Sequence, residues 1–246
     1  MKQRVSNLGY LVIAIAIFSS VIVLANAYIY KYKSQETVTV TGLGETSFTS
    51  DLIVWSGHID VETMNVEQGY KELEKHKAIV SEYILSKGIP ASATTFDFVS
   101  VNKEYAPSYG ANGNYSGQRF TGYTLTQPIV IESSDVEAVE SMSREISSLI
   151  ANGITIEAYS PAYYYTKLDD VKLSLIETAS ADALLRATKI AEASGAKLGK
   201  VQSAKMGVFQ ITGANTNEEY AAGGSLNTSS RNKKARITIK IDYRTK

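Results

Sequence analysis

Three side chains capable of acid-base or metal-binding chemistry alternate along one short segment of the chain. His58, Asp60 and Glu62 are separated by single residues, within a stretch at 51–61 that alternates like a β-strand. Alternate side chains of a strand point to the same face, so the three groups would lie together. An imidazole beside two carboxylates can bind a metal ion or transfer protons. The pattern fits a metal-dependent hydrolase, or a solvated strand end on which His58 forms ordinary hydrogen bonds.

Other catalytic patterns are missing from the sequence. The chain has no cysteine, which excludes thiolate chemistry, and it has neither a G-x-x-x-x-G-K-[ST] phosphate loop nor a G-x-S-x-G elbow. His76 lies in a run of charged residues typical of a solvated helix face. The Gly-Leu-Gly segment at 42–44 lacks a third glycine in register, and we expect it to form a tight turn that ends a strand at 37–41. We therefore predict no catalytic, cofactor-binding or metal-binding residues, and keep the hydrolase as an alternative.

Tyrosines gather at two long polar loops, at 107–117 and 213–232. The tyrosines concerned are Tyr105, Tyr109 and Tyr115 at the first loop and Tyr220 in the second. Rings on exposed loops can form subunit contacts or stack on ligands, or they can simply be amphipathic side chains at a hairpin tip. We predict that these are interaction loops for a second copy or an envelope protein partner. Lysine plus arginine and aspartate plus glutamate both number 25, so the charge balance points to no nucleic-acid partner.

An uncharged apolar segment near the N-terminus predicts membrane insertion. Residues 8–27 carry no charge, and a helix of this length crosses the hydrocarbon core of a bilayer. Tyr28 and Tyr30 follow it where an interfacial aromatic belt would lie. We predict a transmembrane helix at 8–30, from Leu8 to Tyr30, after a short cytoplasmic tail at 1–7.

The same segment has features of a cleavable signal peptide. Lys2 and Arg4 precede it, and Ala25-Asn26-Ala27 offers a small-x-small cleavage site after Ala27. The apolar run is longer than an ordinary signal core, which favours a retained anchor. Signal cleavage after Ala27, which would release a soluble protein, is the alternative.

The rest of the chain alternates between strand and helix patterns after a polar tether at 31–36. Period-two alternation predicts strands, and apolar residues at helical spacing predict helices. The expected strands are 37–41, 51–61, 95–105, 120–133, 154–158, 200–212 and 235–243. The expected helices are 66–86, a second opened by an S-x-x-E capping box at 134–137, and 168–194 with an alanine at every fourth position from Ala179 to Ala191.

This order predicts the fold class. From the second strand to the fifth it spells β-α-β-β-α-β, the order of a ferredoxin-like unit, extended by a third helix and two strands. We therefore expect one α+β domain over 37–246, with a largely antiparallel sheet and helices on one face.

Several segments together resemble the SIMPL-domain family of bacterial envelope proteins. They are VTGLGE at 40–45, GYTL at 122–125, the passage at 181–201 that contains KIAEASGAKLGKV, and the closing strand at 235–243. The resemblance covers 37–243, essentially everything outside the membrane segment.

The resemblance implies an extracytoplasmic or periplasmic α+β domain, sometimes assembled into oligomers, with a loose connection to envelope and oxidative stress. It brings no active-site residues with it. Our prediction is therefore a single-pass inner-membrane protein whose C-terminal domain lies in the periplasm. Its expected role in the cell envelope is non-enzymatic, either self-association or binding of a protein partner.

Overall fold

The computed structural model describes residues 7–33, 36–219 and 221–245. Its helices are α1 (Asn7–Lys33), α2 (Val66–Ser86), α3 (Val136–Glu145) and α4 (Leu168–Ala193), with short 3-10 helices η1 (Ala91–Ala93) and η2 (Ile146–Asn152). Its strands are β1 (Thr37–Thr49), β2 (Leu52–Thr63), β3 (Thr94–Phe96), β4 (Ser100–Tyr109), β5 (Tyr115–Ser133), β6 (Thr155–Ala158), β7 (Ala162–Tyr164), β8 (Leu198–Met206), β9 (Gln210–Gly213), β10 (Ser225–Leu226) and β11 (Asn232–Thr245). The predicted α+β class with mostly antiparallel sheets is confirmed.

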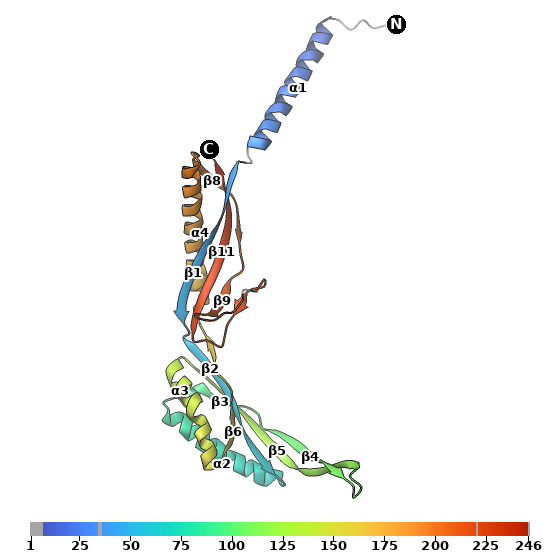
Figure 1. Cartoon of the computed structure of the whole chain (residues 1–246), viewed down its shortest axis with the longest axis vertical. Helices are drawn as coiled ribbons and strands as arrows, with labels where there is room; N and C mark the ends of the chain where they lie inside the picture. Colours follow the sequence, from blue (N-terminus) through green and yellow to red (C-terminus); the bar gives the residue numbers. More distant parts are fainter. Residues whose placement is uncertain (1–6, 34–35, 220, 246) are drawn as a thin grey trace. The chain divides into compact units, whose positions relative to one another are not determined.

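The chain forms two compact units (Figure 1). Unit 1 comprises residues 1–45, 172–209 and 236–246, and unit 2 comprises residues 46–171 and 210–235. The region 37–246, which we expected to form one domain, contributes to both units.

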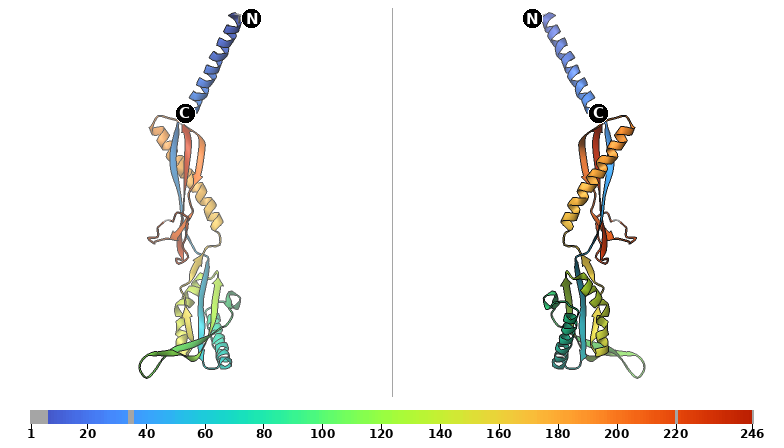
Figure 2. Two further views of the ribbon diagram at one scale, coloured as in Figure 1. Left: turned by 90° about the vertical axis from the view of Figure 1, so that its right-hand side faces the viewer. Right: turned by 90° about the vertical axis from the view of Figure 1, so that its left-hand side faces the viewer.

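Unit 2 contains a six-stranded sheet with two helices on one face. The strand order is β3-β5-β2-β6, with β4 paired to β5 and β7 paired to β2, and the pairings are antiparallel. Strand β5 therefore lies between β3 and β2, the two strands that α2 connects. Helices α2 and α3 cover the same face (Figure 2). Ile53, Trp55, Ile59 and Val61 on β2 point into this core and are buried.

The helix boundaries in unit 2 follow local capping chemistry. Helix α2 begins and ends as predicted; the Asn65 side chain accepts hydrogen bonds from its first turn, and Gly88 adopts a positive φ after its end. The predicted capping box at Ser134 is wrong. The Asp135 carboxylate caps α3 instead, accepting from the Ala138 N–H at 3.0 Å. The apolar residues at helical spacing in α3 and η2 are buried, namely Val136, Val139, Met142, Ile146 and Leu149.

The strand expected at 95–105 is interrupted. Residues 97–99 separate β3 from β4, opposite Pro128 of β5. Proline has no N–H to donate, so β5 lacks one hydrogen bond to this segment, although the Pro128 carbonyl still accepts from the Asp97 N–H at 2.9 Å. The loop expected at 107–117 is also much shorter, because β4 and β5 remain paired as far as Tyr109 and Tyr115.

Unit 1 packs α4 against strands β1, β8 and β11. Strands β1 and β8 both pair with β11, and α4 runs along this sheet (Figure 1). The predicted alanine row is confirmed, because Ala179, Ala183, Ala187 and Ala191 are buried. These small side chains allow the helix to approach the sheet closely.

The expected tight turn at 42–44 is wrong, because β1 passes straight through these residues. A Cβ atom at Gly44 would lie 2.4 Å from the carbonyl oxygen of Leu175 on α4. The glycines are therefore required by a helix that touches the strand backbone, not by a turn. The strand expected at 200–212 is divided into β8 and β9, and its break includes Gly207, whose N–H donates to the carbonyl of Thr238 at 2.7 Å.

Helix α1 is apolar on all sides. Its Gly9–Lys31 segment has the length and composition of a membrane span or a signal sequence, and none of it is buried in the protein.

Candidate functional site

The structure brings together two of the three residues predicted to form a chemical site. The His58 Nε2 atom lies 3.1 Å from Asp60 Oδ2, and the two side chains are 18% and 22% exposed. Both point to the face of the unit 2 sheet opposite α2 and α3, since their neighbours Ile59 and Val61 point into the core. Glu62 is exposed near the end of β2 and forms no ion pair with His58 among those the structure shows.

Two residues that the sequence reasoning missed complete this cluster. Glu157 of β6 pairs directly across from His58, and its Oε2 lies 3.5 Å from His58 Nε2. The Tyr159 hydroxyl lies 3.2 Å from His58 Nδ1. Both residues follow β2 by about a hundred positions, so only the pairing of β2 with β6 reveals that they belong to the cluster.

Hydrogen bonds fix the cluster in place. Thr126 of β5 donates its hydroxyl to Asp60 Oδ1 at 2.6 Å. Burial raises the pKa of the Tyr159 hydroxyl, and the nearby Glu157 carboxylate raises it further, so this hydroxyl is a neutral hydrogen-bonding group at neutral pH. Each His58 ring nitrogen therefore already has a partner in the protein. In the described part of the chain, no group of three or more His, Cys, Asp or Glu side chains is arranged to hold a metal ion.

The second predicted feature, the tyrosine loop, is part of a protruding β-ribbon. Strand β2 pairs with β5 only from Tyr123 to Ser133, so the first half of β5 pairs with β4 alone. Figure 1 shows this two-stranded ribbon extending beyond the part of the sheet that the helices cover. We call residues 104–122 the aromatic ribbon.

Rings line the aromatic ribbon along much of its length. Tyr105, Tyr109 and Tyr115 are 50%, 62% and 62% exposed. Tyr109 and Tyr115 meet edge to face across the two strands, with ring centroids 6.2 Å apart. Phe120, which the sequence reasoning missed, contacts Tyr105 in the same way at 5.8 Å. The ring contacts leave the three tyrosines half or more exposed, while Phe120 is partly buried.

A glycine marks the point where the aromatic ribbon leaves the sheet. The pairing of β4 with β5 shifts by one residue between Glu104 and Tyr105, which indicates a β-bulge. Gly122, on the opposite strand, has a φ of 148°. A Cβ atom there would lie 2.9 Å from the carbonyl oxygen of Thr63. The fourth predicted tyrosine, Tyr220, lies outside the described residues.

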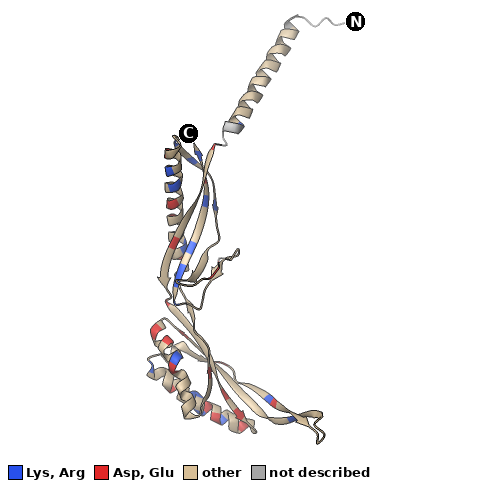
Figure 3. Ribbon diagram, viewed as in Figure 1, with Lys and Arg blue, Asp and Glu red and all other residues tan. Residues whose placement is uncertain are grey.

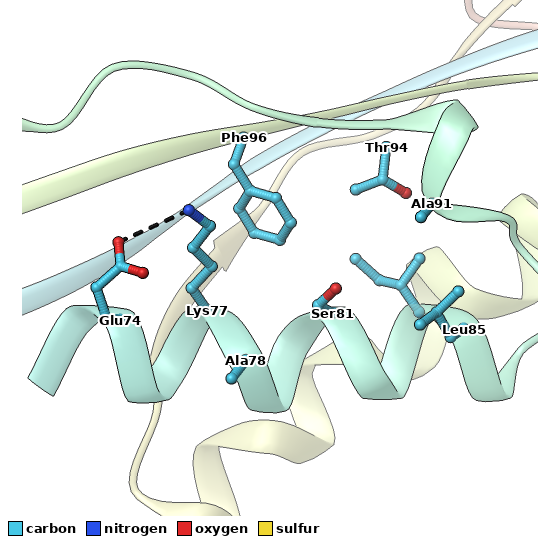
Figure 4. Close-up of a pocket in the computed structure, with 9 residues that line it drawn as sticks. Glu74, Lys77, Ala78, Ser81, Leu85, Ala91, Thr94 and Phe96 are labelled. Atoms are coloured by element: carbon cyan, nitrogen blue, oxygen red, sulfur yellow. Dashed lines mark ion pairs between the residues drawn. The ribbon is translucent and has the colours of Figure 1, made fainter.

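A pocket of ≈ 310 Å³ lies beside α2, between this helix, η1 and β3 (Figure 4). Its two charged lining residues, Glu74 and Lys77, form an ion pair at 3.6 Å. Lys77 also lies over the Phe96 ring, 5.5 Å from its centroid. Glu74 and Lys77 are therefore paired with each other, in a lining that mixes polar and apolar side chains.

Charged residues are distributed differently over the two units. Figure 3 shows mixed charges along α2 and repeated basic residues along β11. On β11, Lys240 lies opposite Lys205 of β8, and Asp242 lies between β1 and β8, accepting from Thr39 and Ser203. These two hydroxyls lower the pKa of Asp242, with Ser203 the larger influence.

The family comparison agrees with the distributed resemblance in the sequence. The model of the SIMPL family, described as a protein of unknown function (DUF541), matches residues 38–243. The chain belongs to the SIMPL family. A search of curated proteins found no match.

The SIMPL region begins after α1 and includes strands and helices of both units. The His58 cluster and the aromatic ribbon both lie within it. The family description assigns no activity, so it supplies no functional residues, and the function must be inferred from these surfaces.

Proposed function

We propose that this SIMPL protein is anchored in the inner membrane by α1 and acts on the far side as a non-enzymatic binding protein. Its partner is a second copy of the chain or another protein of the cell envelope. The main observation behind this proposal is the aromatic ribbon. A role in envelope stress rests on the family resemblance alone.

The ribbon has the physical properties of a binding element. Tyrosine and phenylalanine rings bury large areas on association and lose little side-chain entropy, and they are enriched at protein interfaces. Here Tyr105, Tyr109 and Tyr115 are held by edge contacts but remain half or more exposed. Among the described residues, β5 is the only strand paired with β4, so the backbone groups on the outer edge of β4 have no strand partner there. An unpaired edge can accept a further strand from a partner.

The anchor is supported by α1 and the short tether. Helix α1 ends at Lys33 and β1 begins at Thr37, so the folded region starts within about 15 Å of the helix end by chain length alone. The alternative is cleavage after Ala27 and release of a soluble periplasmic protein.

The binding role is tested with the full chain in detergent. We would replace Tyr105, Tyr109 and Tyr115 by threonine, which favours strands but has no ring. Light scattering and chemical cross-linking should show loss of self-association, or pull-downs should lose a specific partner. The control is Tyr70→Gln on α2, which removes a ring that is 48% exposed from another surface. If the wild-type chain is a monomer without a partner, or if both variants behave alike, the proposal is wrong.

The anchor is tested separately. Carbonate extraction of membranes and the intact mass of the mature chain distinguish the two forms. An intact N-terminus in the membrane pellet supports the anchor. A chain that begins at Tyr28 and is released into the soluble fraction contradicts it.

A further inference from the structure

A lysine is buried beneath the loop that precedes β11. Lys233 is 2% exposed, although lysine is rarely found inside proteins without an ionic partner. Its Nζ lies 2.5 Å from the backbone carbonyl oxygen of Asn227 and 3.4 Å from the side-chain oxygen Oδ1 of the same residue. The amine is therefore directed at one asparagine, whose side chain is itself buried at 9% exposure.

Both ends of the Asn227 carboxamide are held by specific contacts. Its Oδ1 accepts a hydrogen bond from the Ser230 N–H at 2.9 Å, as well as from Lys233. Its Nδ2 donates to Glu218 Oε1 and to Ser229 Oγ, the latter at 3.2 Å. Glu218 is positioned in turn by the Gly213 N–H, which donates to Oε2 at 3.3 Å.

These contacts bring an amine, a carboxamide and a carboxyl group together at one site, and these are the three groups that an amide exchange uses. We propose that Lys233 and Asn227 join to form an intramolecular isopeptide bond, with Glu218 as the proton-transfer group. The Lys233 Nζ attacks Cγ of Asn227, and a new C–N bond forms. The bond between Cγ and Nδ2 then breaks, and Nδ2 leaves as ammonia. One amide and one amine are converted into one amide and ammonia, so the step needs no oxidant or other reactant.

The surroundings favour each part of this reaction. Attack requires a neutral amine, and burial lowers the pKa of the Lys233 amine, against a smaller opposing influence from Glu218. The Ser230 N–H points at the oxygen that becomes negatively charged in the tetrahedral intermediate. The Glu218 carboxyl contacts the leaving nitrogen, where it can pass on the proton lost by Lys233.

The bond would supply a covalent link that this chain cannot obtain from disulfides, since it has no cysteine. It would join Asn227, directly after β10, to Lys233 at the start of β11, closing a ring between positions 227 and 233. An ordinary buried lysine hydrogen bond would use the same contacts without any covalent change, so the mass of the protein decides between the two.

The test is a tryptic peptide map of the purified full-length protein. Trypsin cleaves after Lys205, Arg231 and Lys233, which releases residues 206–231 as one peptide from an unlinked chain. In a linked chain, Lys233 is no longer a cleavage site. We expect residues 206–231 to be attached to the short peptide containing Lys233, with a combined mass lower by one ammonia molecule. Recovery of the free 206–231 peptide, with complete cleavage after Lys233, would overturn the proposal without any variant being needed.

Two variants test the role assigned to Glu218. Glu218→Gln removes the proton-transfer group, and Glu219→Gln changes an exposed neighbour as the matched control. General acid-base groups accelerate such steps by roughly 10²–10⁴-fold, so the linked peptide should fall to background in Glu218→Gln and persist in Glu219→Gln. Linkage that persists in a folded Glu218→Gln protein would contradict this assignment.

Discussion

A Cβ atom placed on Gly42 of β1 would lie 2.0 Å from the carbonyl oxygen of Ala179 on α4. It would also lie 2.6 Å from the Ala183 N atom. Real Cβ atoms do not approach backbone atoms this closely, so even alanine would force the strand and the helix apart. The glycines of β1 and the alanines of α4 are therefore two halves of one packing arrangement.

Gly42→Ala should destabilise unit 1 strongly. Overpacking in a close interface costs about 1–3 kcal/mol, and a backbone clash lies at the upper end of that range. Denaturant unfolding of the full chain in detergent, followed by circular dichroism, measures the loss. The control is Gly223→Ala, because a Cβ atom at Gly223 would have no neighbour within 4 Å. Equal stability of the two variants would show that α4 does not pack tightly on β1.

The same glycines show what the sequence could and could not predict. The alternation of apolar residues correctly predicted β2, and helical spacing correctly predicted α2 and the buried row of α4. The glycines at 42–44 were misread as a turn, because a local pattern cannot distinguish backbone freedom from a requirement for space. The helix that imposes this requirement lies more than a hundred residues later.

Glu140 of α3 binds side chains from three segments of unit 2: α3 itself, β7 and the residue before β11. Its carboxylate accepts from the Tyr163 hydroxyl at 3.0 Å, from Arg231 at 3.0 Å and from Arg144 at 2.8 Å. Glu140→Ala would leave the hydroxyl of the buried Tyr163 without a partner, at a cost of about 1–3 kcal/mol. Denaturant unfolding provides the measurement, with Glu82→Ala on the exposed face of α2 as the control. In a double-mutant cycle with Tyr163→Phe, the two losses of unfolding free energy should not add. If they add, the Tyr163 hydroxyl and Glu140 do not interact.

The His58 cluster provides the test of the hydrolase alternative. Because both ring nitrogens of His58 already have partners, we expect the combined change His58→Ala, Asp60→Ala and Glu157→Ala to leave bound metal and hydrolytic activity as in wild type. Metal content is measured by mass spectrometry of elements in the purified protein, and hydrolysis with ester and phosphoester panels. The control variant replaces Glu82, an exposed carboxylate on α2. Stoichiometric metal in the wild type that is lost only in the triple variant would favour the hydrolase.

The His58 cluster also shows which site residues could be identified from the sequence. Period-two spacing placed His58 and Asp60 on one face correctly, since both lie on one strand. Glu157 and Tyr159 come from β6 and the residue after it, and pairing between distant strands is set by the whole sheet. The sequence identified the tyrosines of the aromatic ribbon but not the ribbon itself, because the ribbon too depends on strand pairing. The tyrosines stand out in the sequence around a polar loop, but the length of the ribbon depends on the register between β4 and β5.

Asp182 should make the stability of unit 1 depend on pH. Its Oδ2 accepts from the backbone N–H of Leu43 at 2.8 Å and from Arg186 at 2.8 Å. The hydrogen bond from Leu43 is the main reason that the pKa of this carboxyl is lowered. A carboxyl whose pKa is lower in the folded protein stabilises it above the unfolded pKa of about 3.9. That stabilisation is lost as the pH falls through the folded pKa.

Asp182→Asn should therefore be less stable than wild type near neutral pH, and the difference should shrink on acidification. We would measure the free energy of unfolding of both proteins from about pH 7 to about pH 3. The other carboxyls titrate in both proteins, so their contribution cancels in the difference and that of Asp182 remains. The control is Glu177→Gln, on the exposed side of the same helix. A wild-type-minus-variant difference that stays constant across this range would show that the Leu43 contact does not depend on the charge of Asp182. If this difference in free energy of unfolding disappears on acidification, the Asp182 carboxylate holds β1 against α4.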